Sequence, residues 1–232
     1  MAAHLEAISA GHIQKLVINI PPGHMKSLMV SVFWQAWEWT RSPETRWLTA
    51  SYAQALSVRD SVKTRRVILS PWYQSHWGDV YRLATDQNQK HRFENDRSGV
   101  RIATSVEGAA TGERCDRAII DDPHNVRQAL SDKRRTEALV FWDETMTTRI
   151  DDPMCGGQVI VMQRLHERDL SGHVLQDGGY VHLMLPMEYE PGRRCHTAIG
   201  FKDPRRNDGE LLWPARFGPQ ALSEWKTRLG SY

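Results

Sequence analysis

The sequence predicts an α/β fold in which a mostly parallel central sheet is flanked by helices. Short apolar runs alternate along the chain with longer segments of helical periodicity, and most of these runs are apolar at every position. Strands that are buried on both faces are typical of parallel sheets covered by helices. With 232 residues, the chain is long enough for one such domain of generous size, with or without an appendage.

The individual elements follow from the position of each run. The segments KHRFEN and GVRIATS are separated by DRS, which indicates a β-hairpin. In chain order, the expected elements are a strand at 16–20, a helix at 27–39, a strand at 46–51, a helix through 67, the hairpin over 90–105, a strand at 117–121, a long helix to about 148, a strand at 157–163, a helix at 167–176, a strand at 180–187 and a short helix at 219–229.

Composition narrows the class of protein. Cys115, Cys155 and Cys195 stand far apart, which argues against a disulfide framework or a zinc ribbon and suits a reducing cytoplasm. No run approaches the roughly 20 apolar residues of a membrane span, and the first residues lack the apolar stretch of a secretory signal. We therefore expect a protein that is not secreted and has no membrane partner.

Charge is balanced overall but clustered locally. The formal net charge is only +2, so the chain has no strong global attraction for nucleic acid. Arg59, Lys63, Arg65 and Arg66 nevertheless fall within eight positions, and a second basic run covers 133–135. Such runs are typical of solvated helix faces, and a DNA-facing patch is the alternative.

A candidate phosphate-binding loop follows the first strand, where INIPPGHMKS leads into the first long helix. In a loop of this kind, backbone N–H groups bind phosphate, a lysine neutralises it and a serine reaches Mg²⁺. The match to G-x-x-x-x-G-K-[ST] is incomplete, because Ile20 and Met25 occupy both glycine positions. The candidate binding residues are Pro22, Gly23, His24, Met25, Lys26 and Ser27.

Two acids end the strand at 117–121. In a Mg²⁺-dependent NTPase, the first such acid (here Asp121) holds the metal's water shell and the second (here Asp122) polarises the attacking water. The alternative is a helix N-cap, since an acid before Pro123 is a favoured helix start. Because α/β sheets bind ligands at the carboxyl ends of their strands, we expect both acids and Lys26 at the ends of neighbouring strands.

A third strand, at 157–163, carries polar residues to the same edge of the sheet. Gln163 is placed to hydrogen-bond a terminal phosphate or the attacking water. Arg164 is an alternative for this role, although a surface salt bridge is the simpler expectation for an arginine at this position.

Five segments, taken in this order, resemble the ATPase domain of the large terminase subunits of tailed phages: PPGHMKSLMVS, SYAQALSVRDS, TSVEGAATGE, AIIDDPHN and VIVMQRLHERDLSGH. The resemblance covers roughly residues 16–190. It implies a RecA-like, additional-strand P-loop NTPase fold. It also implies a homo-oligomeric ring that hydrolyses ATP with Mg²⁺ and packages double-stranded viral DNA into a procapsid.

The resemblance also implies roles for individual residues. Lys26 and Ser27 match the Walker A pair, and Asp121 matches the Walker B acid that holds the metal together with Ser27. Asp122 takes the catalytic position that is usually Glu, and Gln163 lies in the motif that couples hydrolysis to movement.

Ring ATPases also use an arginine finger from a neighbouring subunit, which stabilises transition-state charge. Arg114, in the loop before the acid strand, is the candidate, with Arg101 and Arg117 as alternatives.

The resemblance further implies partners and a location. Double-stranded DNA, a small terminase subunit and a portal protein are the expected partners, in the cytoplasm of the host of a phage or prophage. Residues 1–190 would form the ATPase domain. Residues 191–232, which are rich in Pro, Gly and Arg, would form an appendage or the start of a linker to a nuclease domain that the chain lacks.

Two other functions are compatible with the residues. Asp121, Asp122 and Glu188 at strand ends would suit a metal-dependent nuclease, although Lys26 and Ser27 would then have no role. The missing loop glycines would suit an ATPase fold that no longer hydrolyses ATP and serves as a scaffold. A measurement of nucleotide binding distinguishes the ATPase from the nuclease. A measurement of phosphate release distinguishes the ATPase from the scaffold.

Overall fold

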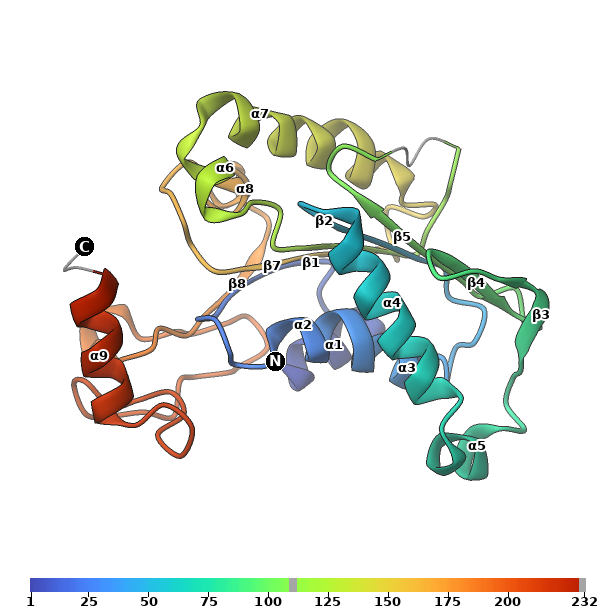
Figure 1. Cartoon of the computed structure of the whole chain (residues 1–232), viewed down its shortest axis with the longest axis horizontal. Helices are drawn as coiled ribbons and strands as arrows, with labels where there is room; N and C mark the ends of the chain where they lie inside the picture. The colour runs from blue at the N-terminus through green and yellow to red at the C-terminus, as the bar shows by residue number, and fades with distance from the viewer. Residues whose placement is uncertain (109–111, 230–232) are drawn as a thin grey trace.

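An eight-stranded sheet forms the centre of the chain in this computed structural model, which describes residues 1–108 and 112–229 (Figure 1). The strands are β1 (Lys15–Asn19), β2 (Trp47–Ser51), β3 (Leu83–Asn88), β4 (Arg92–Asn95), β5 (Val100–Ser105), β6 (Arg117–Asp121), β7 (Gly157–Met162) and β8 (Val181–Met184). Their order is β3-β4-β5-β2-β6-β7-β1-β8, and only the β3–β4 and β4–β5 pairs are antiparallel. The predicted α/β fold with a mostly parallel sheet is confirmed.

Strand β7 lies between β1 and β6. Ile18 of β1 and Asp121 of β6 both have Val161 of β7 as their register partner, so β7 pairs in parallel with both strands. The phosphate-loop candidate and the acidic pair therefore lie at the same edge of the sheet but two strands apart. The expectation of neighbouring strands was wrong on this point, because a third strand is inserted between them.

Helices cover both faces of the sheet. Figure 1 shows α1 to α4 on one face and α6 to α8 on the other. The helices are α1 (Ala2–Ser9), α2 (Lys26–Leu28), α3 (Trp34–Glu38), α4 (Gln54–Ile68), α5 (Pro71–Trp77), α6 (Val126–Leu130), α7 (Asp132–Val140), α8 (Leu170–Asp177) and α9 (Pro219–Leu229). A π-helical turn at 29–33 joins α2 to α3, so the expected helix at 27–39 is confirmed as one continuous helical segment. α1, α5 and β3 were not predicted.

Alternate residues of each central strand contribute to two cores. Ile18 of β1 packs in the core beneath α3 with Trp34, whereas its neighbour Val17 packs in the opposite core with Trp142. All four side chains are at most 3% exposed. A strand with a core on each face must be apolar at every position, which explains the uniform runs in the sequence.

The segment after residue 190 packs against the phosphate-loop candidate. The ring of Phe217 stacks on His24 with a centroid distance of 4.8 Å. It also covers Gly23, where an added Cβ would lie 2.6 Å from Cζ of Phe217. The C-terminal segment thus contacts the loop directly, and its last helix, α9, was predicted correctly at 219–229.

Candidate active site

The loop after β1 adopts a conformation suited to an anion. Gly23 has φ 78° and Met25 has φ 60°, so two residues of the loop are left-handed. The backbone N–H groups of Gly23, His24 and Met25 donate no hydrogen bond to any described residue. Met25 occupies the second glycine position of the motif and keeps a glycine-like backbone, at a cost of about 1–2 kcal/mol. Strain of this kind is typical of functional loops.

The helix that follows brings two hydroxyl groups and a lysine to the acidic pair. Nζ of Lys26 lies 2.9 Å from Oδ2 of Asp122. Oγ of Ser27 donates to Oδ1 of Asp121 at 3.1 Å, and Oγ of Ser31 donates to Oδ2 of the same carboxylate at 2.8 Å. Tertiary structure therefore unites the two motifs, which lie about ninety residues apart in the chain.

The surroundings of the Asp121 carboxyl disfavour its ionised form. Burial raises its pKa to about 7, and the neighbouring Asp122 charge acts in the same direction, against the hydrogen bonds of Ser31 and Ser27 and the charge of Lys26. Two acids thus share one lysine, and one of the two acids is buried. A divalent cation would relieve this crowding, since Mg²⁺ is bound by carboxylate and hydroxyl oxygens.

Asp122 follows β6 in a left-handed conformation, with φ 47°. Its N–H donates to the carbonyl of Val161 at 2.8 Å, and its carbonyl accepts from the N–H of Tyr52 at 3.1 Å. The helix α6 begins later, at an N-cap formed by Asn125, which makes a capping box with Gln128. The alternative of a helix N-cap for the two aspartates is therefore wrong, because Asn125 takes that role.

Gln163 directly follows β7, the strand between the phosphate-loop strand and the acid strand. It lines a cavity of about 300 Å³ with Asn19, Pro21 and Pro22. It does not line the cavity that contains Asp121 and Asp122. The adjacent Arg164 forms a salt bridge with Asp169 at 3.0 Å, as expected for it.

Arg114 lies at the opposite end of β6 from the acids. Its Nη1 donates to the carbonyl of Thr148 at 3.3 Å, and its side chain is exposed. Of the two alternatives, Arg101 is 0% exposed, and Arg117 is held by Glu38 in a buried pair. Exposure favours Arg114 among the three for a contact with another subunit.

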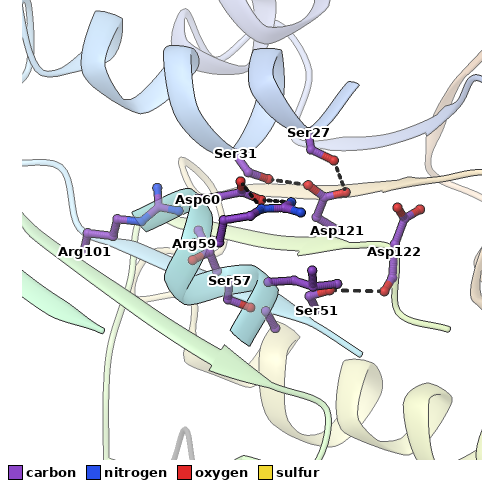
Figure 2. A pocket seen from close by; sticks show the side chains of 12 residues that line it. Ser27, Ser31, Ser51, Ser57, Arg59, Asp60, Arg101, Asp121 and Asp122 are labelled. Atoms are coloured by element: carbon purple, nitrogen blue, oxygen red, sulfur yellow. Dashed lines mark hydrogen bonds and ion pairs between the residues drawn. The ribbon is translucent and has the colours of Figure 1, made fainter. Parts of the chain in front are cut away.

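The cavity between the helix start and α4 contains residues that the sequence did not place in this site (Figure 2). Besides Ser27 and both acids, it is lined by Ser31, Arg59, Asp60 and Arg101. Ser31 could have been found from the sequence, since it lies one helical turn after Ser27 on the same face. Arg59 and Asp60 lie in a segment noted in the sequence, but their place beside the acids depends on the packing of α4.

The acids expected for a nuclease are not gathered. In the described ranges, 1–108 and 112–229, no group of three or more His, Cys, Asp or Glu side chains could hold a metal ion. Glu188 instead forms an ion pair with Lys226 at 2.6 Å. Within those ranges, also, no helix has the length and apolar character needed to cross a membrane.

Most members of the basic runs have partners within the chain. Arg65 donates to the side chain of Asn88 at 2.7 Å, and Arg134 pairs with Glu107 and Glu137. Lys133 and Arg66 are exposed. The pairing accords with solvated helix faces.

Comparison with protein-family models finds none that matches the chain, and comparison with curated proteins finds no significant relative. Any statement of function rests on the residues and their geometry.

Proposed function

We propose that the chain is an ATP-hydrolysing motor of the kind that packages double-stranded viral DNA, corresponding to the ATPase domain of a large terminase subunit. The observation that carries the proposal is the meeting of Lys26–Ser27 with Asp121–Asp122 at one edge of the sheet. The strand β7 between β1 and β6 is compatible with the additional-strand fold that the resemblance implies.

The residues fit ATP and Mg²⁺. Three loop N–H groups without a partner among the described residues, together with Lys26, form a cradle for phosphate oxygens. Ser27 and Asp121 would hold Mg²⁺, and their oxygens already lie 3.1 Å apart. When bound, Mg²⁺ supplies charge neutralisation at the phosphate oxygens.

Asp122 is the candidate general base. Its Oδ2 is paired with Nζ of Lys26, at 2.9 Å. Phosphate oxygens that attract Lys26 would free this carboxylate to accept a proton from water. The side chain of Asp122 is 32% exposed, so water has access to it. Nucleotide binding and activation of the base are thus linked through one lysine.

The remaining assignments come from the resemblance and extend the proposal. Gln163 would hydrogen-bond the terminal phosphate or the attacking water and so couple hydrolysis to movement. Arg114 would act on the nucleotide of a neighbour in a homo-oligomeric ring. DNA, a small terminase subunit and a portal protein would be the partners, in the host cytoplasm.

The test is nucleotide binding and turnover by the whole chain and by Lys26→Ala, with and without double-stranded DNA. We expect Lys26→Ala to lose ATP binding or turnover, because the phosphates lose the lysine of the loop. Lys133→Ala, which removes an exposed lysine on α7, is the matched control and should behave as the wild type. Unchanged ATP affinity and rate in Lys26→Ala would remove the loop from the mechanism. Binding without any turnover by the wild type would favour the scaffold alternative.

A further inference from the structure

Three charged side chains in the cavity are not used by the mechanism above. Arg59 and Asp60 come from α4, and Arg101 comes from β5. Figure 2 shows the guanidinium group of Arg59 beside Asp60 and pointing toward Asp121. The cavity itself measures about 20 Å³, which is room for about one water molecule. A phosphate group would therefore lie at its open side.

Asp60 holds Arg59 in a fixed orientation. Nε and Nη2 of Arg59 donate to the two carboxylate oxygens of Asp60 at 3.0 and 2.8 Å. Asp60 is also held by Lys63, at 3.2 Å. The Asp60 side chain is 5% exposed and that of Arg59 is 49% exposed, so a buried carboxylate anchors a cation that a ligand can reach.

Part of the Arg59 guanidinium remains available. Its Nη1 donates no hydrogen bond to any residue that the structure describes. A bidentate contact through Nε and Nη2 leaves both hydrogens of Nη1 for an anion, and arginine suits phosphate oxygens in particular.

Guanidinium groups and acids line this cavity together. Arg59 and Arg101 line it with Asp60, Asp121 and Asp122, and Lys26 and Lys63 are paired with two of these carboxylates. Arg101 is fully buried, and its Nε and Nη2 lack a partner within the described chain. These donors, together with Nη1 of Arg59, have no partner in the described ranges and favour an anionic ligand at this place.

We propose that Arg59 is a catalytic residue that contacts the terminal phosphate of ATP bound to the same chain, and that Asp60 is the residue that positions it. This inference rests on the proposed function. In the reaction, the oxygen of water forms a bond to the terminal phosphorus and the bond to the ADP oxygen breaks. ADP leaves with the electron pair, and the water proton passes to Asp122. Arg59 stabilises the negative charge on the terminal phosphate oxygens during this transfer.

The test compares Arg59→Ala with Arg66→Ala in the whole chain. Arg66 is an exposed arginine two turns further along α4 and does not line the cavity, so it controls for the loss of charge and for the helix. Turnover is measured with and without double-stranded DNA, and affinities are measured for ATP and ADP separately. We expect kcat of Arg59→Ala to fall at least about 10²-fold, as for loss of one donor to a transition-state charge.

The affinities separate contact with the terminal phosphate from a structural role. Arg59→Ala should bind ATP more weakly and ADP as the wild type does, because ADP lacks the terminal phosphate. Arg59→Lys should restore part of the lost kcat, since it keeps the charge without the bidentate contact to Asp60. Asp60→Asn should lower kcat by less than Arg59→Ala and leave ADP affinity unchanged.

Three outcomes would overturn the inference while leaving the proposed function in place. One is wild-type turnover by Arg59→Ala. Another is an equal loss of ATP and ADP affinity, which would indicate a structural role. The third is a loss of DNA affinity alone, which would make Arg59 a DNA contact. If the wild-type chain itself neither binds nor hydrolyses ATP, the proposed function fails and the inference fails with it.

Discussion

The two ends of the central sheet both carry ion pairs, but they differ in how the acids are partnered. At the amino end, Arg117 and Glu38 form a pair at 2.6 Å with side chains 9% and 4% exposed. At the carboxyl end, Asp121 and Asp122 share Lys26, and burial raises the pKa of Asp121 to about 7. Burial also raises the pKa of Glu38, but the bidentate contact with Arg117 acts against it. The carboxyl end differs in that two acids adjacent in sequence share one lysine beside the candidate phosphate loop.

Non-glycine residues with positive φ occur at both ends, one at the amino end (Ser98, φ 67°) and two at the carboxyl end. Arg46 donates its backbone N–H to the Asp116 carboxylate at 2.8 Å and its Nη2 to the same group at 2.9 Å. Main chain and side chain of Arg46 thus bind one carboxylate. At the carboxyl end, Met25 and Asp122 both have positive φ. Strained backbone and crowded acids occur together there, as is typical of functional sites.

The largest effect is expected for Asp122→Asn. The amide fits the same space and should leave ATP binding intact, but it cannot accept a proton, so turnover should fall by about 10²–10⁴-fold. Steady-state turnover and ATP titration measure the two quantities. The control is Asp151→Asn, the same chemical change at the amino end. Turnover at the wild-type rate would place the catalytic carboxylate elsewhere, with Glu107 and Glu113 as the next candidates.

At the amino end, Glu38→Ala should destabilise the fold without changing catalysis. Removing one partner leaves the buried Arg117 charge uncompensated, which typically costs about 3–5 kcal/mol of unfolding free energy. Urea unfolding measures this cost, and ATP affinity below the transition should equal that of the wild type. A double variant, Glu38→Met with Arg117→Met, should be more stable than Glu38→Ala because no lone charge remains. A change in ATP affinity in Glu38→Ala would show that the ion pair at the amino end also affects the candidate site at the carboxyl end.

The titration of Asp121 should give a smaller effect with a defined sign. Its pKa in the folded chain lies above the ordinary value, so the folded chain binds this proton more tightly than the unfolded chain does. The resulting stabilisation is complete below about pH 4 and is lost as the pH rises through about 7.

Asp121→Asn, which stays neutral, isolates this contribution. Its unfolding free energy minus that of the wild type, without Mg²⁺ or nucleotide, should increase from pH 4 to pH 7. The subtraction also cancels the pH-dependent contributions of His4, His124 and His182, which both proteins share. Burial lowers the pKa values of these histidines to about 4, so their stabilising contribution is lost as the pH falls. A difference that does not change with pH would show that Asp121 is already ionised.

The smallest effect is expected for Asp151→Asn. Asp151 is 50% exposed and pairs with Nη2 of Arg46 at 2.8 Å, a group that Asp116 also holds. Solvent screens exposed pairs, so the urea midpoint should not change measurably in moderate salt. A clear shift would mean that the exposed part of the amino-end network also stabilises the fold.

Much of the fold could be predicted from the pattern of apolar residues in the sequence. The apolar runs around Val17, Ile119 and Ile160 have a core on each face, so no other placement would bury them. The hairpin around β4 and β5 was likewise set by local turn chemistry. The edge strand β3 was missed because LATDQN is mostly polar, which leaves no periodic signal. The helix α5 was signalled by Ser70 as N-cap followed by Pro71, a start signal that could have been recognised.

For the site, the sequence by itself determined the chemistry of the parts: a lysine and a serine at a helix start, and two acids at a strand end. Only the tertiary structure decided which parts meet. Strand order is one example, since uniformly apolar strands are interchangeable in sequence and nothing local places β7 between β1 and β6. Arg59 and Asp60 are another, because they reach the acids only through the packing of α4 on the sheet. Local sequence fixes what a side chain can do, whereas its partners across the fold depend on long-range packing that no local pattern encodes.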